Sequence, residues 1–258
     1  MKNTRKKPSN WEAIRSFGYA VLLALLFRSV AFEPFHIPSG SMLPTLKIGD
    51  YIFVSKFSYG YSRYSFPFGA HIPYFEGRIF ASEPVRGDII VFRTPQNTSV
   101  DYIKRLIGLP GDKIQVIEGV LYVNGIPVSL RKVPDYREDL ADGGLGPEVR
   151  RYQETLPGGR VHDVIDERPY GNIDGNGFDS DNTDIYTVPE GYYFFMGDNR
   201  DNSVDSRFSN DLGFVPVENL VGRAEMIFFS FKQGVAIWEF WRWPSAFDNA
   251  RWFRSLRS

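Results

Sequence analysis

Two serines separated by one glycine lie in a proline-flanked segment near the N-terminus and are the first candidates for chemistry. They are Ser39 and Ser41, within the segment 35–50. In an extended chain, hydroxyls two residues apart face the same side, so one could attack a carbonyl while the other donates to the developing oxyanion. The alternative is an ordinary turn stabilised by serine hydroxyls, which is the commoner role of an isolated Ser-Gly-Ser.

A lysine on an apolar strand could supply the base that such a serine needs. Within 101–112, strand alternation places Tyr102, Lys104 and Leu106 on one face and Arg105 on the other. Burial beside apolar residues lowers the pKa of a lysine, because the charged form is disfavoured there. The alternative is an edge-strand lysine that protects the sheet against aggregation.

Histidine chemistry is poorly represented in this chain. The only histidines are His36, His71 and His162, and no G-x-S-x-G elbow surrounds Ser41. A serine activated by a lysine is the known alternative to the serine–histidine–aspartate triad, and it explains this scarcity of histidine. The absence of cysteine excludes thiolate catalysis, disulfides and cysteine-ligated zinc. We therefore expect no metal and no cofactor.

Polar residues also crowd the segment 197–207, directly after an apolar strand. This pattern suits a functional loop, a solvated turn or a cation site. Calcium is disfavoured because the aspartates lack a following bidentate glutamate. A second calcium look-alike, 172–177, has Thr183 at the twelfth position and no flanking helices, so it is disfavoured as well.

The composition favours a mainly β protein that positions these residues. Aromatic residues make up 16% of the 258 residues, and 24 glycines and 17 prolines suit many turns between short strands. No amphipathic helix is expected after the first 34 residues, and Asn124-Gly125 predicts a tight hairpin turn. The patterns predict strands at 50–55, 88–92, 102–107, 113–117, 120–123, 192–196 and 226–231.

The expected order of domains begins with a basic tail at 1–10 and a transmembrane anchor at 11–34. The apolar stretch 16–32 is long enough for one spanning helix, with Arg28 snorkelling to the interface. The basic tail places the N-terminus in the cytoplasm and the remainder outside. The alternative is a signal peptide cleaved after Ala31, which Arg28 disfavours.

The β catalytic body is expected at 35–231, followed by a tail at 232–258. The body contains an extended hairpin at 57–83 and an inserted small β or loop subdomain at 131–186. Four of the five tryptophans lie in the tail, where arginines alternate with them. This composition suits a membrane interface, and a segment packed on the β body is the equal alternative.

Four motifs, taken together, resemble the bacterial type I signal peptidases (leader peptidases). The segment 38–45, Pro-Ser-Gly-Ser-Met-Leu-Pro-Thr, resembles the family's nucleophile box. The segments 86–89, Arg-Gly-Asp-Ile, and 102–112, from Tyr-Ile-Lys-Arg to Pro-Gly-Asp, resemble the next two boxes. The segment 197–207, which begins Gly-Asp-Asn-Arg, resembles the last. The four boxes stand in the family order behind an N-terminal anchor, and they cover roughly 11–130 and 187–231.

The resemblance implies a role for each box. It makes Ser41 the nucleophile and Lys104 the general base, with the Ser41 backbone N–H and the Ser39 hydroxyl as the oxyanion hole. It makes Ser203 the residue that orients Lys104. Supporting ion pairs are implied between Asp205 and Arg207 and between Asp198 and Arg105. Shallow apolar pockets for small substrate residues are implied at Phe35, Ile37, Met42, Ile52, Val91, Tyr102 and Ile103.

The resemblance also implies the setting of the enzyme. It would be a single-pass protein of the bacterial inner membrane, with its catalytic body on the periplasmic face. Its partners would be secreted preproteins cut after Ala-x-Ala sites, membrane lipid and a nearby translocon. The net charge of −1 gives no reason to expect nucleic acid. The alternatives are a specialised processing protease of conjugation or pilus type, and a non-catalytic anchored β domain that binds envelope partners.

Overall fold

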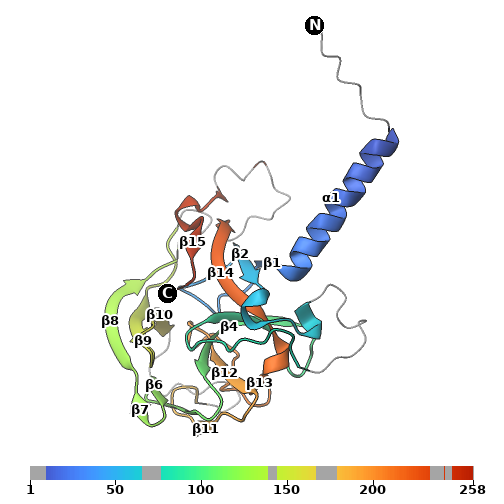
Figure 1. Ribbon diagram of the computed structural model, residues 1–258. Helices are drawn as coiled ribbons and strands as arrows, with labels where there is room; N and C mark the ends of the chain where they lie inside the picture. Colours follow the sequence, from blue (N-terminus) through green and yellow to red (C-terminus); the bar gives the residue numbers. More distant parts are fainter. Residues whose placement is uncertain are drawn as a thin grey trace.

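An N-terminal helix leads into an antiparallel β body in the computed structural model of the chain (Figure 1). The structure describes residues 10–65, 77–138, 144–166, 179–232, 241 and 246–257. After the N-terminal helix the described residues contain one further α-helical residue, Ala246, and four short 3-10 turns, namely η1 Phe57–Tyr59, η2 Arg63–Ser65, η4 Val217–Asn219 and η5 Asn249–Arg251. The expected mainly β class is therefore confirmed.

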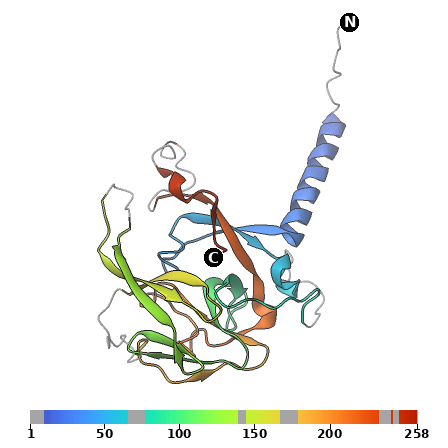
Figure 2. The ribbon, with the colours of Figure 1, turned by 60° about the vertical axis from the view of Figure 1, so that its left-hand side comes forward.

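Helix α1 spans Asn10–Val30 and projects away from the β body in both ribbon views (Figures 1 and 2). It ends where Phe32 begins to pair with strand β2, so the chain leaves the helix before the expected boundary at residue 34. Its described apolar side chains are largely exposed, with Trp11 67%, Phe17 72% and Leu23 66% accessible. Nowhere in the described ranges does a helix combine the length and the apolar character that crossing a bilayer demands.

The largest sheet is antiparallel and brings together strands that are far apart in the sequence. Valine, isoleucine and aromatic side chains dominate these strands and suit a pleated, buried surface. Strand β15, Arg254–Ser255, pairs with β14 and lies outside the linear strand order. The order is β1 Phe32–His36, β2 Asp50–Ser55, β14 Leu220–Ser230, β3 Ile89–Arg93, β4 Asp101–Gly108, β12 Tyr192–Met196 and β13 Val215–Pro216.

A second sheet has four strands and continues from the end of β4. Asn124 and Gly125 both have positive φ, 56° and 77°, which confirms the tight turn expected between two of its strands. The strand order is β11 Tyr186–Thr187, β5 Lys113–Ile117, β6 Val120–Val123 and β7 Ile126–Pro127.

The inserted segment forms a small β sheet of its own, the first of its two expected forms. The sheet begins two residues before the expected start at 131, and residues 139–143 and 167–178 lie outside the described residues. The calcium look-alike at 172–177 is among these. The strand order is β10 Val161–Asp166, β9 Val149–Thr155 and β8 Ser129–Tyr136, a unit that we call the β8–β10 subdomain.

The segment 57–83, where we expected an extended hairpin, is described only in part, and the hairpin stays a prediction. The described part contains two 3-10 turns and one antiparallel bridge, between Tyr61 and Ile79, while residues 66–76 lie outside the described residues. The Arg78 guanidinium donates to the carbonyls of Tyr59 and Gly60 at 2.9 and 2.7 Å. A side chain therefore satisfies carbonyls that a strand ladder would otherwise use.

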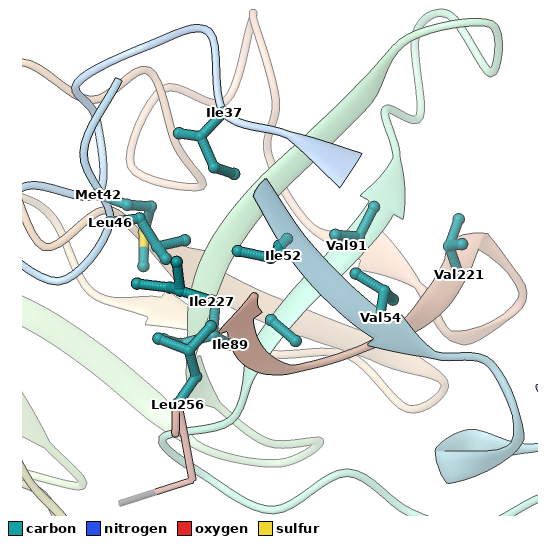
Figure 3. Close-up of a cluster of buried hydrophobic side chains, with 11 residues drawn as sticks. Ile37, Met42, Leu46, Ile52, Val54, Ile89, Val91, Val221, Ile227 and Leu256 are labelled. Carbon is teal, nitrogen blue, oxygen red and sulfur yellow. The ribbon is translucent and has the colours of Figure 1, made fainter. Parts of the chain in front are cut away.

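The central strands of the large sheet are buried on both faces. Alternate residues of β3 enter two different clusters, with Ile89 and Val91 in one and Ile90 and Phe92 in the other. Figure 3 shows the first cluster, where side chains from residues 37–46 meet those of β2, β3 and β14. We call residues 37–46 the nucleophile segment, because they contain the candidate nucleophile Ser41. The nucleophile segment is thus part of the core.

The described part of the C-terminal segment packs on the β body. The Arg251 guanidinium contacts the buried Asp50 carboxylate at 2.5 Å, and the Trp252 ring lies 5.2 Å from the ring of Phe229. Trp241 is 63% exposed. Trp238 and Trp243 lie outside the described residues, and contact between this tail and lipid remains a prediction.

Candidate active site

Ser41 and Lys104 meet at the junction of a turn and a strand. The Lys104 Nζ donates to the Ser41 Oγ at 2.6 Å, and the two residues are 4% and 9% exposed. Lys104 extends from β4, whereas Ser41 sits in a turn closed by a bond from the Leu43 N–H to the Gly40 carbonyl, at 3.1 Å. A hydroxyl and an amine are therefore held within proton-transfer distance.

The surroundings of Lys104 favour its neutral form. Burial is the main cause that lowers the pKa of Lys104 to about 8, while the nearby carboxylates of Asp205 and Asp198 oppose that shift. The Nζ also lies 5.3 Å from the centre of the Tyr102 ring, as expected for two residues on one strand face. A substantial fraction of such a lysine is unprotonated near neutral pH.

Ser39 does not lie beside Ser41 in the way that an extended chain would place it. The chain bends at Gly40 and turns at Ser41, so the simple alternation that we assumed does not hold. Ser39 is exposed, whereas Ser41 is buried. The bend leaves Ser39 exposed, while the Ser41 hydroxyl contacts Lys104.

The Arg105 side chain leaves the other face of β4 and forms a buried ion pair. Its Nε and Nη2 donate to the two carboxylate oxygens of Asp198 at 2.8 and 2.6 Å. The Thr45 hydroxyl donates to the same carboxylate at 2.5 Å. The expected pair therefore forms, and through Thr45 it also reaches the nucleophile segment, a contact that the sequence did not indicate.

Asp205 and Arg207 form the second expected pair, and both side chains are buried. The Arg207 Nε and Nη2 donate to the Asp205 carboxylate at 2.9 and 3.0 Å, and the Gly197 N–H donates to it at 3.0 Å. Burial by itself would raise the pKa of Asp205, but the Arg207 guanidinium holds that pKa below its ordinary value. The ionised pair closes the loop 197–207.

Two residues that sequence reasoning missed, Asn199 and Gly197, join this loop to the turn 40–43 that carries Ser41, which we call the nucleophile turn. The Asn199 N–H donates to the Ser41 carbonyl at 3.2 Å, and its side-chain amide donates to the Gly40 carbonyl at 3.3 Å. A Cβ at Gly197 would lie 2.4 Å from the Ser41 carbonyl oxygen and 2.3 Å from the Ser203 Oγ. Only glycine fits there, and its place in the Gly-Asp-Asn motif was the available signal.

Ser203 lies beside the nucleophile turn, but its expected bond to Lys104 is not formed. Its Oγ is buried and has no hydrogen-bond partner among the described residues. A Cβ added at Gly197 would touch both the Ser203 hydroxyl and the Ser41 carbonyl oxygen, so these two groups lie close together. The structure therefore brings Ser203 to the site without the contact that its expected role requires.

The expected substrate-binding residues gather in one place, but most are not open to substrate. Ile37, Met42, Ile52 and Val91 are at most 2% exposed and form a core cluster (Figure 3). The strand pairings bury them, so these four cannot line a shallow pocket directly. The accessible members of the expected set are half-buried, namely Phe35, Tyr102 and Ile103.

The acidic groups of the site are committed to arginines. Asp198 is paired with Arg105 and Asp205 with Arg207, so neither carboxylate is available as a ligand for a metal ion. Within the described ranges there is no group of three or more histidine, aspartate or glutamate side chains placed to hold a metal ion. The arrangement suits nucleophilic attack by a serine on a carbonyl, with a lysine as base.

Comparison with known proteins is consistent with this chemistry. The family model described as "Signal peptidase, peptidase S26" matches residues 10–229. The chain is 50% identical to the signal peptidase I of Rickettsia conorii over 218 residues, 84% of this chain and 79% of that protein. It is 47% identical to the signal peptidase I of Rickettsia typhi over 230 residues, 89% of this chain and 84% of that protein.

A solved structure is also similar to this chain. It is the crystal structure of a signal peptidase I from Enterococcus faecalis, with 29% sequence identity and a TM-score of 0.30. The match covers 55% of this chain and 97% of the Enterococcus chain.

Proposed function

The chain belongs to the signal peptidase family S26, and from this premise we propose that Ser41 and Lys104 form its catalytic dyad. As a member of this family it is a serine protease that removes signal peptides. The observation that carries the proposal is the 2.6 Å contact between the Lys104 Nζ and the Ser41 Oγ inside a buried site.

In the proposed mechanism the neutral Lys104 amine removes the proton of Ser41 as its Oγ attacks the scissile carbonyl. The resulting ammonium then protonates the leaving amine, and an acyl-enzyme on Ser41 is hydrolysed by water activated by the same lysine. The pKa of Lys104, lowered to about 8 by burial, supports this role because the base must be unprotonated before attack.

The oxyanion would be held by the Ser41 N–H and the Ser39 hydroxyl. The exposure of Ser39 supports this assignment, since the hydroxyl is free to approach a bound substrate. Ser203 would orient the neutral lysine by rotating its hydroxyl toward the Nζ. An unpaired buried hydroxyl costs about 1–3 kcal/mol, so a rotation that finds a partner is favoured.

Cleavage after small-x-small sequences would follow from the limited depth of the binding surface. The half-buried Phe35 and Ile103 form the accessible edge, while the core residues beneath them leave little room for a large side chain. Small residues such as alanine would be accepted at the first and third positions before the cut. The substrates would be secreted preproteins.

Attachment to the membrane through α1 is the remaining part of the proposal. The described apolar side chains of α1 are exposed, and such a surface is unfavourable in water. The basic N-terminus would keep residues 1–10 in the cytoplasm and place the body on the periplasmic face, near lipid and the translocon. Protease added to intact spheroplasts should digest the body. Protection that is lost only on lysis would contradict this orientation.

The catalytic proposal is tested with purified protein in detergent and a preprotein that bears an Ala-x-Ala site. The wild type should release the signal peptide, and Ser41→Ala should release none while retaining the wild-type melting temperature. Mass spectrometry of the product identifies the bond that is cut. Cleavage by Ser41→Ala at a rate near that of the wild type would exclude Ser41 as the nucleophile.

A further inference from the structure

The β8–β10 subdomain is joined to the catalytic loop through the backbone of β10. The Ile165 N–H donates to the Asp198 carbonyl at 3.0 Å, and the Arg200 N–H donates to the Ile165 carbonyl at 3.0 Å. Ile165 and Asn199 form an isolated parallel bridge. One strand of the subdomain therefore runs beside residues 198–200. The middle residue of these, Asn199, donates to the nucleophile turn.

A buried ion pair reinforces this junction from the next strand. Glu154 on β9 is fully buried, and its carboxylate accepts a bond from the Arg200 Nη2 at 2.6 Å. Burial disfavours the charged guanidinium, yet the Glu154 carboxylate raises the pKa of Arg200 above its ordinary value. Without Glu154, Arg200 would be a buried cation that depends on the more distant Asp198 and Asp205, which already pair with Arg105 and Arg207, and its neighbouring histidine cannot compensate it.

That histidine is His162 on β10, and it lies between the two buried acids. Its Nε2 is 3.4 Å from the Glu154 Oε2 and 3.9 Å from the Asp198 Oδ1. Burial, with the neighbouring Arg105 and Arg200, lowers the pKa of His162 well below its ordinary value, so the ring is neutral. Among the described residues of the subdomain, Glu154 is the acid that forms an ion pair with Arg200.

We infer that Glu154 is a positioning residue for catalysis, because it holds Arg200 and through it the loop that carries Asn199 against Ser41. The chain of contacts is short. Glu154 fixes the side chain of Arg200, Asn199 precedes Arg200, and Asn199 donates to the carbonyls of Ser41 and Gly40. This inference rests on the proposed Ser41–Lys104 dyad, and it gives the inserted subdomain a role in that dyad's geometry.

Displacement of the loop has an electrostatic signature at Lys104. Burial is the main cause that lowers the pKa of Lys104, while the Asp205 and Asp198 carboxylates raise it and Arg207 lowers it. If the loop moves away, water reaches Lys104 and its pKa rises, because the effect of burial is the larger one. The acidic limb of the kcat/KM profile should then move to higher pH. A variant that only unfolds a fraction of the enzyme leaves that limb in place.

The experiment measures kcat, KM and the pH profile for Glu154→Gln and Glu154→Asp with the Ala-x-Ala preprotein. Glu154→Gln should lower kcat about 10- to 100-fold, as expected for a misplaced catalytic group, with KM unchanged and the acidic limb at higher pH. Glu154→Asp keeps the charge but shortens the side chain. It should therefore fold and show smaller changes in the same directions, even if Glu154→Gln does not fold.

Glu148→Gln is the matched control. It removes the same charge just before β9, where Glu148 pairs with Arg137 at 2.7 Å on the exposed surface. This variant should match the wild type in kcat, KM and pH profile. The inference is overturned if Glu154→Asp, and Glu154→Gln where it folds, behave like Glu148→Gln, or if kcat falls only in step with the folded fraction while the limb stays fixed.

Failure of the dyad itself has a different result. Cleavage by Ser41→Ala, or no cleavage by the wild type, would contradict the proposed function and this inference together. Cleavage by the wild type that depends on Ser41 and is insensitive to Glu154 would contradict this inference alone.

Discussion

Lys56 and Lys104 are buried to nearly the same extent, but only Lys56 has a carboxylate in contact among the described residues. Lys56 is 2% exposed, and its Nζ lies 2.7 Å from the Glu33 carboxylate and donates to the Ser65 carbonyl at 2.6 Å. Lys104 is 4% exposed, and its Nζ donates to the Ser41 hydroxyl. Among the described residues no carboxylate lies within ion-pair distance of Lys104.

The comparison separates burial from the ability to act as a base. Burial disfavours any ammonium, but a carboxylate in contact restores the charged form. Lys56 has such a carboxylate and is suited to hold β1 against the turn at η1. Lys104 has a neutral hydroxyl in that position, while its nearest acids are committed to arginines. Burial without a contacting carboxylate is what suits a lysine to accept a proton.

Removal of each lysine should break the comparison most sharply. Lys104→Met should abolish preprotein cleavage, because Lys104 is the base that contacts the Ser41 hydroxyl among the described residues, and Lys104→Arg should fail equally because a guanidinium stays protonated. Lys56→Met should retain the wild-type kcat and lose stability. Initial rates and melting temperatures for the three variants provide the measurement. Loss of kcat in a folded Lys56→Met would remove the distinction between the two regions.

Substitution of Ser39 tests whether groups around Ser41 act on the transition state. Ser39→Ala should lower kcat by about 10²–10³-fold with little change in KM, because an oxyanion donor acts only as charge develops. The matched variant is Ser65→Ala in the Lys56 region, where the Ser65 backbone carbonyl accepts the bond from Lys56 and is retained. An effect of Ser39→Ala confined to KM would make it a substrate-binding residue instead.

Gly197 tests how closely the loop must approach the nucleophile turn. Gly197→Ala should lower kcat by about 10²-fold, since the added Cβ would push against the Ser41 carbonyl and the Ser203 hydroxyl. A folded variant with the wild-type kcat would show that the close approach is dispensable. Circular dichroism and kinetics on the same sample separate folding from catalysis.

The smallest effect is expected where Glu33 supports Lys56. Glu33→Gln should lower the free energy of unfolding by about 1–3 kcal/mol, because it weakens the partner of a buried ammonium. The kcat should stay at the wild-type value. Urea unfolding measures the change. A fall in kcat without a fall in stability would place this region in the catalytic machinery.

Strands with alternating or continuous apolar patterns could be predicted from the sequence. The strands β2, β5, β6 and β12 have the expected bounds because each buries at least one apolar face against a neighbour. The strand β1 was not predicted, and for β8–β10 a small β subdomain was one of the two expected forms but its individual strands were not predicted. Their sequences contain Pro34 and Pro134 with many charged residues, and they pair at an edge or in a small, half-exposed sheet, so burial left little pattern.

The active-site residues were predicted from the resemblance of four motifs to those of a known family, and the structure then supplied the distances between these residues. The contact of Ser41 with Lys104 and the pairs Arg105–Asp198 and Asp205–Arg207 agree with that expectation. The bend at Gly40 could not be predicted from alternation, because turns break it. Glu154 could not be predicted either, since its partner lies 46 residues away and a charged residue in a polar strand usually faces solvent.

The most direct test of the account is the pH dependence of kcat/KM for preprotein cleavage. Below its pKa Lys104 is protonated and cannot accept the Ser41 proton, so activity should rise with pH along an acidic limb governed by a group near pH 8. The His36→Gln variant should give the same limb. Loss of that limb in His36→Gln, together with cleavage by Lys104→Met, would make the histidine the base and contradict the account.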